Sequence, residues 1–251
     1  MPGISFLVYE LLLAGGAGLL GAGPRPALTH CDTVPAGTRT ISPKHLGNFT
    51  VVRQLTMTRG DSITPFGTQT ETLTSGRLDG GPTLLDVLVF DTPRGRTVDS
   101  SWIESETLKP LRLKSDNAAR SVTLEFGDGR VQGRTVPADS APILTDRRLE
   151  VYPFEWNVMA LAVSALPLRD GYCASLPVYS DRAGRVSWYQ VDVLGDTTIA
   201  RKSRGPEPVW EVVARADSAV PEVRYWISRR HRVVSRVLVS EPGISIMYAR
   251  D

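Results

Sequence analysis

The sequence predicts a mainly β fold in which one antiparallel sheet carries a single helix on its concave face. From residue 49 onward, apolar and polar residues alternate with the period of two that is typical of strands. Turn signals rich in glycine and proline separate these stretches at short intervals, as in a meandering antiparallel sheet. Only residues 154–166 depart from this rhythm and place apolar residues near helical spacing.

The clearest predicted hairpin spans residues 121–136. Val122, Leu124 and Phe126 alternate with polar residues, so we expect them to share one face of a strand. An Asp-Gly pair at residues 128–129 supplies the tight turn to the returning strand. We predict further strands over residues 49–58, 68–75, 83–90, 97–104, 108–114, 172–179, 186–194, 209–216, 222–228, 232–240 and 244–249.

The predicted helix lies between two prolines. Pro153 suits a first helical turn, and Pro167 ends the helix because the residue before a proline avoids the helical conformation. Its apolar face should cover part of the core of the sheet. The residues near helical spacing are Trp156, Met159, Ala160, Val163 and Leu166.

The N-terminal segment divides into two parts ahead of the β domain. Residues 1–23 are apolar and end in small residues, which is typical of a secretory signal peptide. A transmembrane anchor is the alternative, but Glu10 and the many glycines argue against a stable span. Residues 24–48 are rich in Pro, Thr and Gly and are interpreted as a linker, followed by one β domain over residues 49–251.

Charge and cysteine content limit the function and the redox compartment. The net charge is +2, from 29 basic and 27 acidic residues, so nothing favours a nucleic-acid partner. The two cysteines, Cys31 and Cys173, could form one disulfide in an exported protein, or they could remain independent thiols. The sequence leaves that choice open.

Residues that could carry catalysis are few. His30, His45 and His231 lack the spacing of a metal motif, and no nucleophile motif accompanies them. Glu104 and Glu106 alternate near Trp102, a pairing that could act on sugars, although such residues on a strand usually face solvent. We therefore expect a protein that is not an enzyme and uses no cofactor or metal, with a hydrolase as the weakest alternative.

An arginine cluster surrounds a predicted turn near the C-terminus. It could contact anionic lipid headgroups, which would bring the protein to a membrane surface as a peripheral partner. The competing and favoured interpretation is a solvated turn that also protects a sheet edge from pairing. The cluster consists of Arg229, Arg230, Arg232 and Arg236.

Several short strings together resemble a known family. They are DSSWI (residues 99–103), TLKPLR (107–112), PLRDGY (167–172) and YWIS followed by RVVSR (225–228 and 232–236). The chain resembles the domain of unknown function 3108 family of bacterial envelope proteins over residues 49–249. It departs from the family pattern at Ser228, where an acidic residue is usual.

The resemblance implies a strongly curved antiparallel sheet, similar to the half-barrels of the lipoprotein carriers LolA and LolB. It also implies export to the periplasm or cell envelope of a bacterium, and it supplies no catalytic residues. Such a concave apolar face can hold a lipid or another apolar ligand, and an envelope scaffold that binds other proteins is the alternative. The residues expected to line the concave face are Trp102, Trp156, Met159, Trp188, Trp210 and Trp226.

Overall fold

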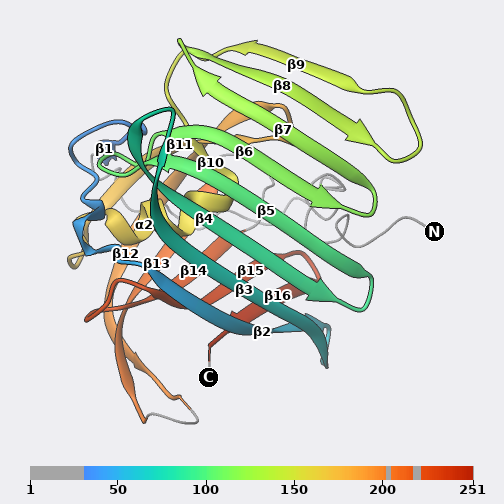
Figure 1. Ribbon diagram of the computed structural model, residues 1–251. Helices are drawn as coiled ribbons and strands as arrows, with labels where there is room; N and C mark the ends of the chain where they lie inside the picture. Colours follow the sequence, from blue (N-terminus) through green and yellow to red (C-terminus); the bar gives the residue numbers. More distant parts are fainter. Residues whose placement is uncertain (1–30, 202–204, 217–221, 251) are drawn as a thin grey trace.

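The computed structural model describes residues 31–201, 205–216 and 222–250 (Figure 1). Within these ranges the strands form one 16-stranded sheet. The strands are β1 (Asp32–Thr33), β2 (Phe49–Arg59), β3 (Ser62–Leu78), β4 (Gly81–Thr92), β5 (Gly95–Glu104), β6 (Pro110–Asn117), β7 (Arg120–Gly127), β8 (Arg130–Pro137), β9 (Ile143–Arg148), β10 (Phe154–Glu155), β11 (Cys173–Ser180), β12 (Arg185–Ile199), β13 (Glu207–Ala216), β14 (Glu222–Ser228), β15 (Val234–Glu241) and β16 (Ile244–Ala249). The helical elements are η2 (Pro43–His45), η3 (Trp156–Val158) and α2 (Met159–Ala165).

The sheet is a meander in two halves. Strands β2 to β9 pair in sequence order, as do β11 to β16, and β16 pairs antiparallel with β2 to join the halves. The short strands β1 and β10 are parallel to β11, and the other pairings are antiparallel. The predicted mainly β fold with one curved antiparallel sheet is therefore confirmed.

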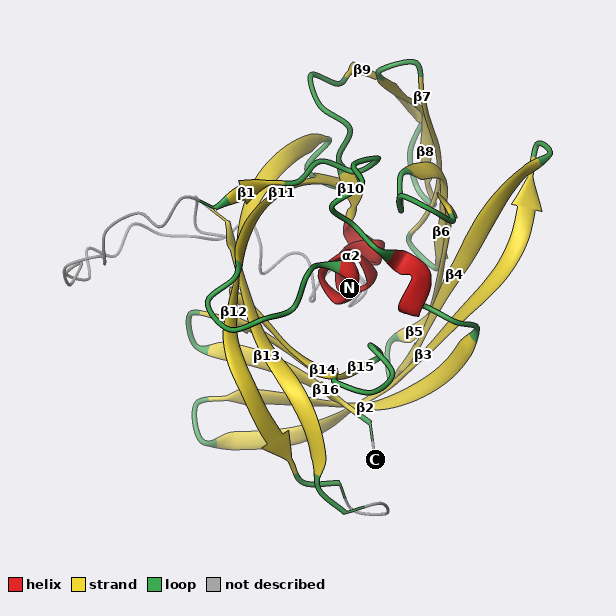
Figure 2. Cartoon of the chain, turned by 90° about the vertical axis from the view of Figure 1, so that its left-hand side faces the viewer, coloured by secondary structure: helices red, strands yellow, loops and turns green. Residues whose placement is uncertain are grey.

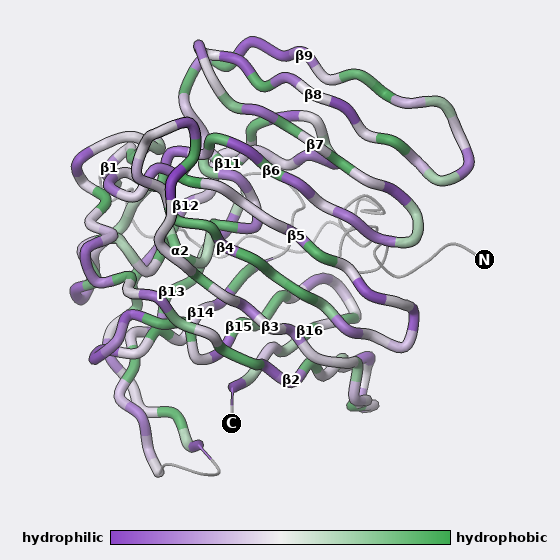
Figure 3. The backbone as a smooth tube through the Cα atoms, in the orientation of Figure 1, coloured by the Kyte–Doolittle hydropathy of each residue, from purple (hydrophilic) through white to green (hydrophobic). Residues whose placement is uncertain are grey.

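Alternation along the strands gives the sheet a buried face and a more polar face, which Figure 3 shows as changing hydropathy along the tube. In β7, Val122, Leu124 and Phe126 are buried on one face, as predicted. Seen end-on, the sheet curves around the helix, which lies on the concave side (Figure 2). At a register shift between β2 and β3, Gly67 has φ +133°, and a Cβ there would lie 2.2 Å from the Asp91 carbonyl oxygen. Only glycine fits this position, where the bulge bends the strand pair.

The helix is shorter than predicted. Phe154 and Glu155 pair with β11 as the short strand β10, and a 3-10 turn precedes α2. The helix ends at Ala165 because Leu166, which precedes Pro167, is extended with ψ 159°. The packing is as expected: Met159, Leu161, Ala162 and Val163 are buried in the main core cluster.

Residues 31–48 are not a linker in this structure. Val34, Ala36, Ile41 and Leu46 are buried in the main core cluster, so this segment belongs to the β domain. The linker prediction rested on the proline, threonine and glycine content of this segment and missed its spaced apolar residues. The predicted signal peptide, residues 1–23, and residues 24–30 lie outside the described residues. Across the ranges that are described, no helix combines the length and apolarity needed to cross a membrane.

Strands β7 and β11, which lie near opposite ends of the strand order, contact each other through side chains. Phe126 on β7 and Tyr179 on β11 meet edge to face, with ring centroids 5.6 Å apart. Arg120 on β7 forms an ion pair of 2.7 Å with Asp181, just beyond β11. These contacts hold the curved shape while the sheet remains open. Strand β9, which was not predicted, lies beyond β7 and β8 at one edge of the sheet (Figure 1).

Candidate functional site

The concave face carries a second apolar cluster, which adjoins the main core through Val237 and Val239. Its buried members are Leu55 on β2, Phe66 on β3, and Ile246 and Tyr248 on β16. Side chains that are only partly buried surround them: Met57, Phe90, Val237 and Val239. No residue of α2 belongs to this cluster, whereas α2 packs in the main core. We call these eight residues the concave apolar patch.

Strand register brings the patch together. Ile246 lies opposite Met57 on one side and opposite Val239 on the other, so all three share a face. Tyr248 lies opposite Leu55 in the next inward row, and its ring meets Phe90 edge to face at 6.4 Å. Two sequence segments nearly 200 residues apart, β2 and β16, thus build one apolar surface.

The inward-facing residue that precedes Leu55 on β2 is a buried arginine. Arg53 shares the inward face of Leu55 and is almost completely buried. Its guanidinium donates to Gln69 Oε1 at 3.0 Å, to Glu71 Oε2 at 2.5 Å and to the Val234 carbonyl oxygen at 2.7 Å. The charge is therefore paired and its donors are used, as a buried charge requires.

Three further carboxyl groups lie on the same concave side. Asp86 on β4 is 2% exposed, and neither of its oxygens has a hydrogen-bond partner among the described residues. Its pKa is raised well above the usual value by burial and then by Glu71 and Glu155. Burial raises the pKa of Asp99 on β5 to about 6, against a hydrogen bond from Ser115. Burial likewise raises the pKa of Glu155 to about 8.

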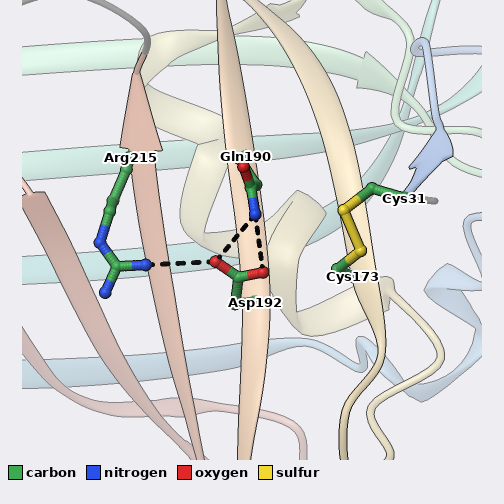
Figure 4. The surroundings of a disulfide bond; sticks show 5 residues. All are labelled: Cys31, Cys173, Gln190, Asp192 and Arg215. Carbon is green, nitrogen blue, oxygen red and sulfur yellow. Dashed lines mark hydrogen bonds and ion pairs between the residues drawn. A yellow bond between two sulfur atoms is a disulfide. The ribbon is translucent and has the colours of Figure 1, made fainter. Parts of the chain in front are cut away.

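Among the described residues, the one group with three metal-type donors in reach of each other is Cys31, Cys173 and Asp192. The two cysteines are joined by a disulfide, so they offer no thiolate. The Asp192 carboxylate accepts hydrogen bonds from the side chains of Gln190 and Arg215 (Figure 4).

A comparison with known protein families shows which family the chain belongs to. Residues 51–245 match the family described as "Protein of unknown function (DUF3108)". The chain belongs to this family. A search of curated proteins finds no match. The predicted resemblance is thereby confirmed over the β domain of this DUF3108 protein.

Half of the predicted ligand-lining residues of the DUF3108 protein lie on the concave side. Trp156 on η3 packs against the main core and lies 5.6 Å from the Tyr189 ring. Met159 is completely buried in that core. Trp210 on β13 packs at its edge, with the Arg229 guanidinium 4.9 Å from its ring. These three side chains fill the helix-covered part of the sheet and lie outside the concave apolar patch.

The prediction that Trp102, Trp188 and Trp226 line the concave face is wrong. Each lies beside an inward residue in its strand, and alternation therefore turns each to the convex face. The inward neighbours are Ser101 and Ile103, Tyr189, and Tyr225 and Ile227, and all of these are buried. Trp102 lies near the cations of Arg112 and Lys114, and Trp188 is 37% exposed. Ring size suggested the concave face, but strand register decides it.

Glu104 and Glu106 do not share a strand face. Strand β5 ends at Glu104, and Glu106 lies in the following turn. The Thr107 hydroxyl donates to the Glu104 carboxylate, so this carboxylate holds the turn. His45 and His231 are exposed, and His30 lies outside the described residues.

Three of the four arginines in the predicted cluster bond to other parts of the fold. Arg229 forms an ion pair of 2.7 Å with Asp196, and Arg232 donates to the Leu166 carbonyl oxygen at the end of the helix. Arg236 donates to the Ala200 carbonyl oxygen. These contacts favour the interpretation of a structured turn.

Sequence reasoning missed the buried carboxyl groups. Asp86 lies between Leu84 and Leu88 at inward positions of an alternating strand, which is a signal the sequence contains. Glu155 carries no such signal, because its position depends on the short strand β10.

Proposed function

We propose that this protein is a non-catalytic, exported cell-envelope protein that holds a lipid or another apolar ligand on the concave face of its sheet. The observation that carries the proposal is the concave apolar patch. Met57, Phe90, Val237 and Val239 are large apolar side chains that the fold leaves partly buried on an inward face. Apolar surface of this kind is a common signature of ligand or partner binding.

The disulfide supports the exported location. Cys31 and Cys173 are bonded although 142 residues apart in sequence. Disulfides persist mainly in oxidising compartments such as the bacterial periplasm. An envelope location would also place the apolar patch near lipids.

Titration with a fluorescent long-chain fatty acid tests the proposal. We expect saturable binding to the wild-type protein, and at least about tenfold weaker binding to Met57→Glu, because a carboxylate would be placed against the acyl chain. Val52→Glu is the matched control, since Val52 lies on the same strand but is 50% exposed on the other face. Phe90→Ala provides a second concave variant without a charge.

Equal binding to the wild-type protein, Met57→Glu and Phe90→Ala would contradict this site. Circular dichroism of each variant shows whether a loss of binding reflects loss of the fold. Because Val52→Glu adds the same charge, it also separates a local effect from electrostatic repulsion of the fatty acid.

A second candidate function, an envelope scaffold that binds another protein, is favoured by strand β9. The opposite edge of the sheet is covered, because β1 and β10 both pair with β11. In contrast, β9 has no strand on its outer side among the described residues. Leu144 is 81% exposed and Ile143 is 59% exposed on this strand. A bare edge with apolar side chains is a site where a partner strand can add.

Photo-cross-linking in the source cell tests the scaffold hypothesis. A photoreactive residue at position 144 should give a cross-link to a defined partner segment. Asp146→Pro should abolish it, because alternation from the Leu149 N–H, which donates to Gly129, turns the Asp146 N–H to the open edge. The same probe at position 52 is the control. Cross-links that survive Asp146→Pro would show that β9 does not pair with the partner through its backbone.

A further inference from the structure

Glu155 occupies an unusual position at the start of the helical segment. It is the last residue of β10 and the N-cap of η3, where its carboxylate accepts from the Asn157 backbone N–H at 3.0 Å. Its other oxygen accepts from the Ser101 hydroxyl on β5 at 2.8 Å. The side chain is 1% exposed. Glu155 therefore joins the helical segment to the facing part of the sheet.

Acidic groups outnumber basic groups around Glu155. Arg53 forms an ion pair with Glu71 and a hydrogen bond with Gln69, and Arg120 forms an ion pair with Asp181. No ion pair between Glu155 and a cation occurs among the described residues. The charged and titratable groups that face this region are Glu71, Asp86, Asp99, Asp181, Arg53, Arg120, Arg182 and Tyr179.

The far end of the helical segment is attached by neutral and cationic donors. The Ser42 backbone N–H donates to the Ala165 carbonyl oxygen at 3.0 Å, and Arg232 donates to the Leu166 carbonyl oxygen at 3.3 Å. Neither contact involves an acid that would titrate. The proton-dependent attachment is therefore confined to the Glu155 end.

We propose that Glu155 is a proton-dependent latch: its protonated carboxyl holds the start of the helical segment, η3 and α2, against β5, and its ionisation favours release of this segment from the sheet. An ionised carboxylate would lie beside Asp86 and Asp99 without a compensating cation. In the released segment the same carboxylate would be hydrated. This inference does not depend on the identity of any ligand.

The direction of the pH effect follows from linkage. Burial raises the pKa of Glu155 from the usual 4.5 to about 8 in the docked state. Release therefore loses a proton at pH values between these limits, and the ratio of released to docked protein rises up to tenfold per pH unit. Docking is strongest below about pH 4.5 and weakest above about pH 8, a range that corresponds to a change of about 3.5 powers of ten.

Hydrogen exchange measured by mass spectrometry tests the latch. Protection of amides in residues 156–165, corrected for intrinsic exchange rates, should fall about tenfold per pH unit between pH 5.5 and 7.5 in the wild-type protein. Glu155→Gln is neutral at every pH, and its amide oxygen can still accept one of the two hydrogen bonds. It should reduce this slope by one factor of ten per pH unit. Glu150→Gln, at an exposed position on the same approach to the helix, should keep the wild-type slope.

Asp99→Asn supplies an independent test if Glu155→Gln does not fold. Removing this negative neighbour should move the pH at which protection levels off to a lower value. An unchanged slope in Glu155→Gln, or an unmoved midpoint in Asp99→Asn, would overturn the proposal. Parallel loss of protection in β13 would overturn it as well, because the helix would then open only with the whole sheet.

Discussion

Arg53 illustrates, at the scale of single residues, how a charge is held inside this sheet. Its contacts join β2 to β3 through Gln69 and Glu71, and to β15 through the Val234 carbonyl oxygen. Removing one partner from such a buried pair leaves the other charge desolvated and uncompensated. The arginine therefore stabilises the fold only together with its partners.

Arg53→Met should lower the free energy of unfolding by about 3–5 kcal/mol, because Glu71 remains buried and unpaired. Urea denaturation measures the change. The control is Arg112→Met, which breaks an arginine–glutamate pair on neighbouring strands where Glu125 is 50% exposed, and it should cost less than about 1 kcal/mol. Adding Glu71→Leu to Arg53→Met should restore part of the loss, and no recovery would contradict the assignment.

At the scale of elements, β8 depends on one glycine. Gly133 has φ +154°, and a Cβ there would lie 2.0 Å from the Thr123 carbonyl oxygen on β7. The strands can approach this closely only because the side chain is absent. Strand β9 pairs with β8 through Gly133, so the exposed edge depends on the same residue.

Gly133→Ala should destabilise the protein by about 2–4 kcal/mol through backbone strain and displacement of β8. Gly127→Ala is the control, since nothing lies within 4 Å of a Cβ at that position. Thermal unfolding of both variants provides the measurement. Equal melting temperatures for the two variants would show that the close approach of β7 and β8 is unimportant.

The presence of strands and of the helix was easier to predict than where these elements end and which face of the sheet a residue occupies. The hairpin of β7 and β8 was predicted because its alternation and its Asp-Gly turn are local signals. The helix start was missed because Phe154 pairs with Val178, a contact that no local pattern indicates. Trp102 was assigned to the wrong face because register is set by Ser101 and Ile103 beside it. Strand β9 was missed because its residues do not alternate.

At the scale of the whole molecule, long-range contacts build the candidate site. Arg53 and Val234 are 181 residues apart in sequence, and Ser101 and Glu155 are 54 apart. The pairing of β16 with β2 closes the concave apolar patch. The curved sheet could be predicted from the family resemblance, but such contacts appear only once the sheet has its register. The patch and the carboxyl groups therefore had to come from the structure.

Native mass spectrometry of the protein, purified from the envelope of its source cell without added lipid, tests the proposed binding role most directly. We expect a mass adduct of one apolar ligand on the wild-type protein, which should be lost in Met57→Glu and retained in Val52→Glu. An adduct-free wild-type protein, or an adduct that persists in Met57→Glu, would contradict binding at the concave apolar patch.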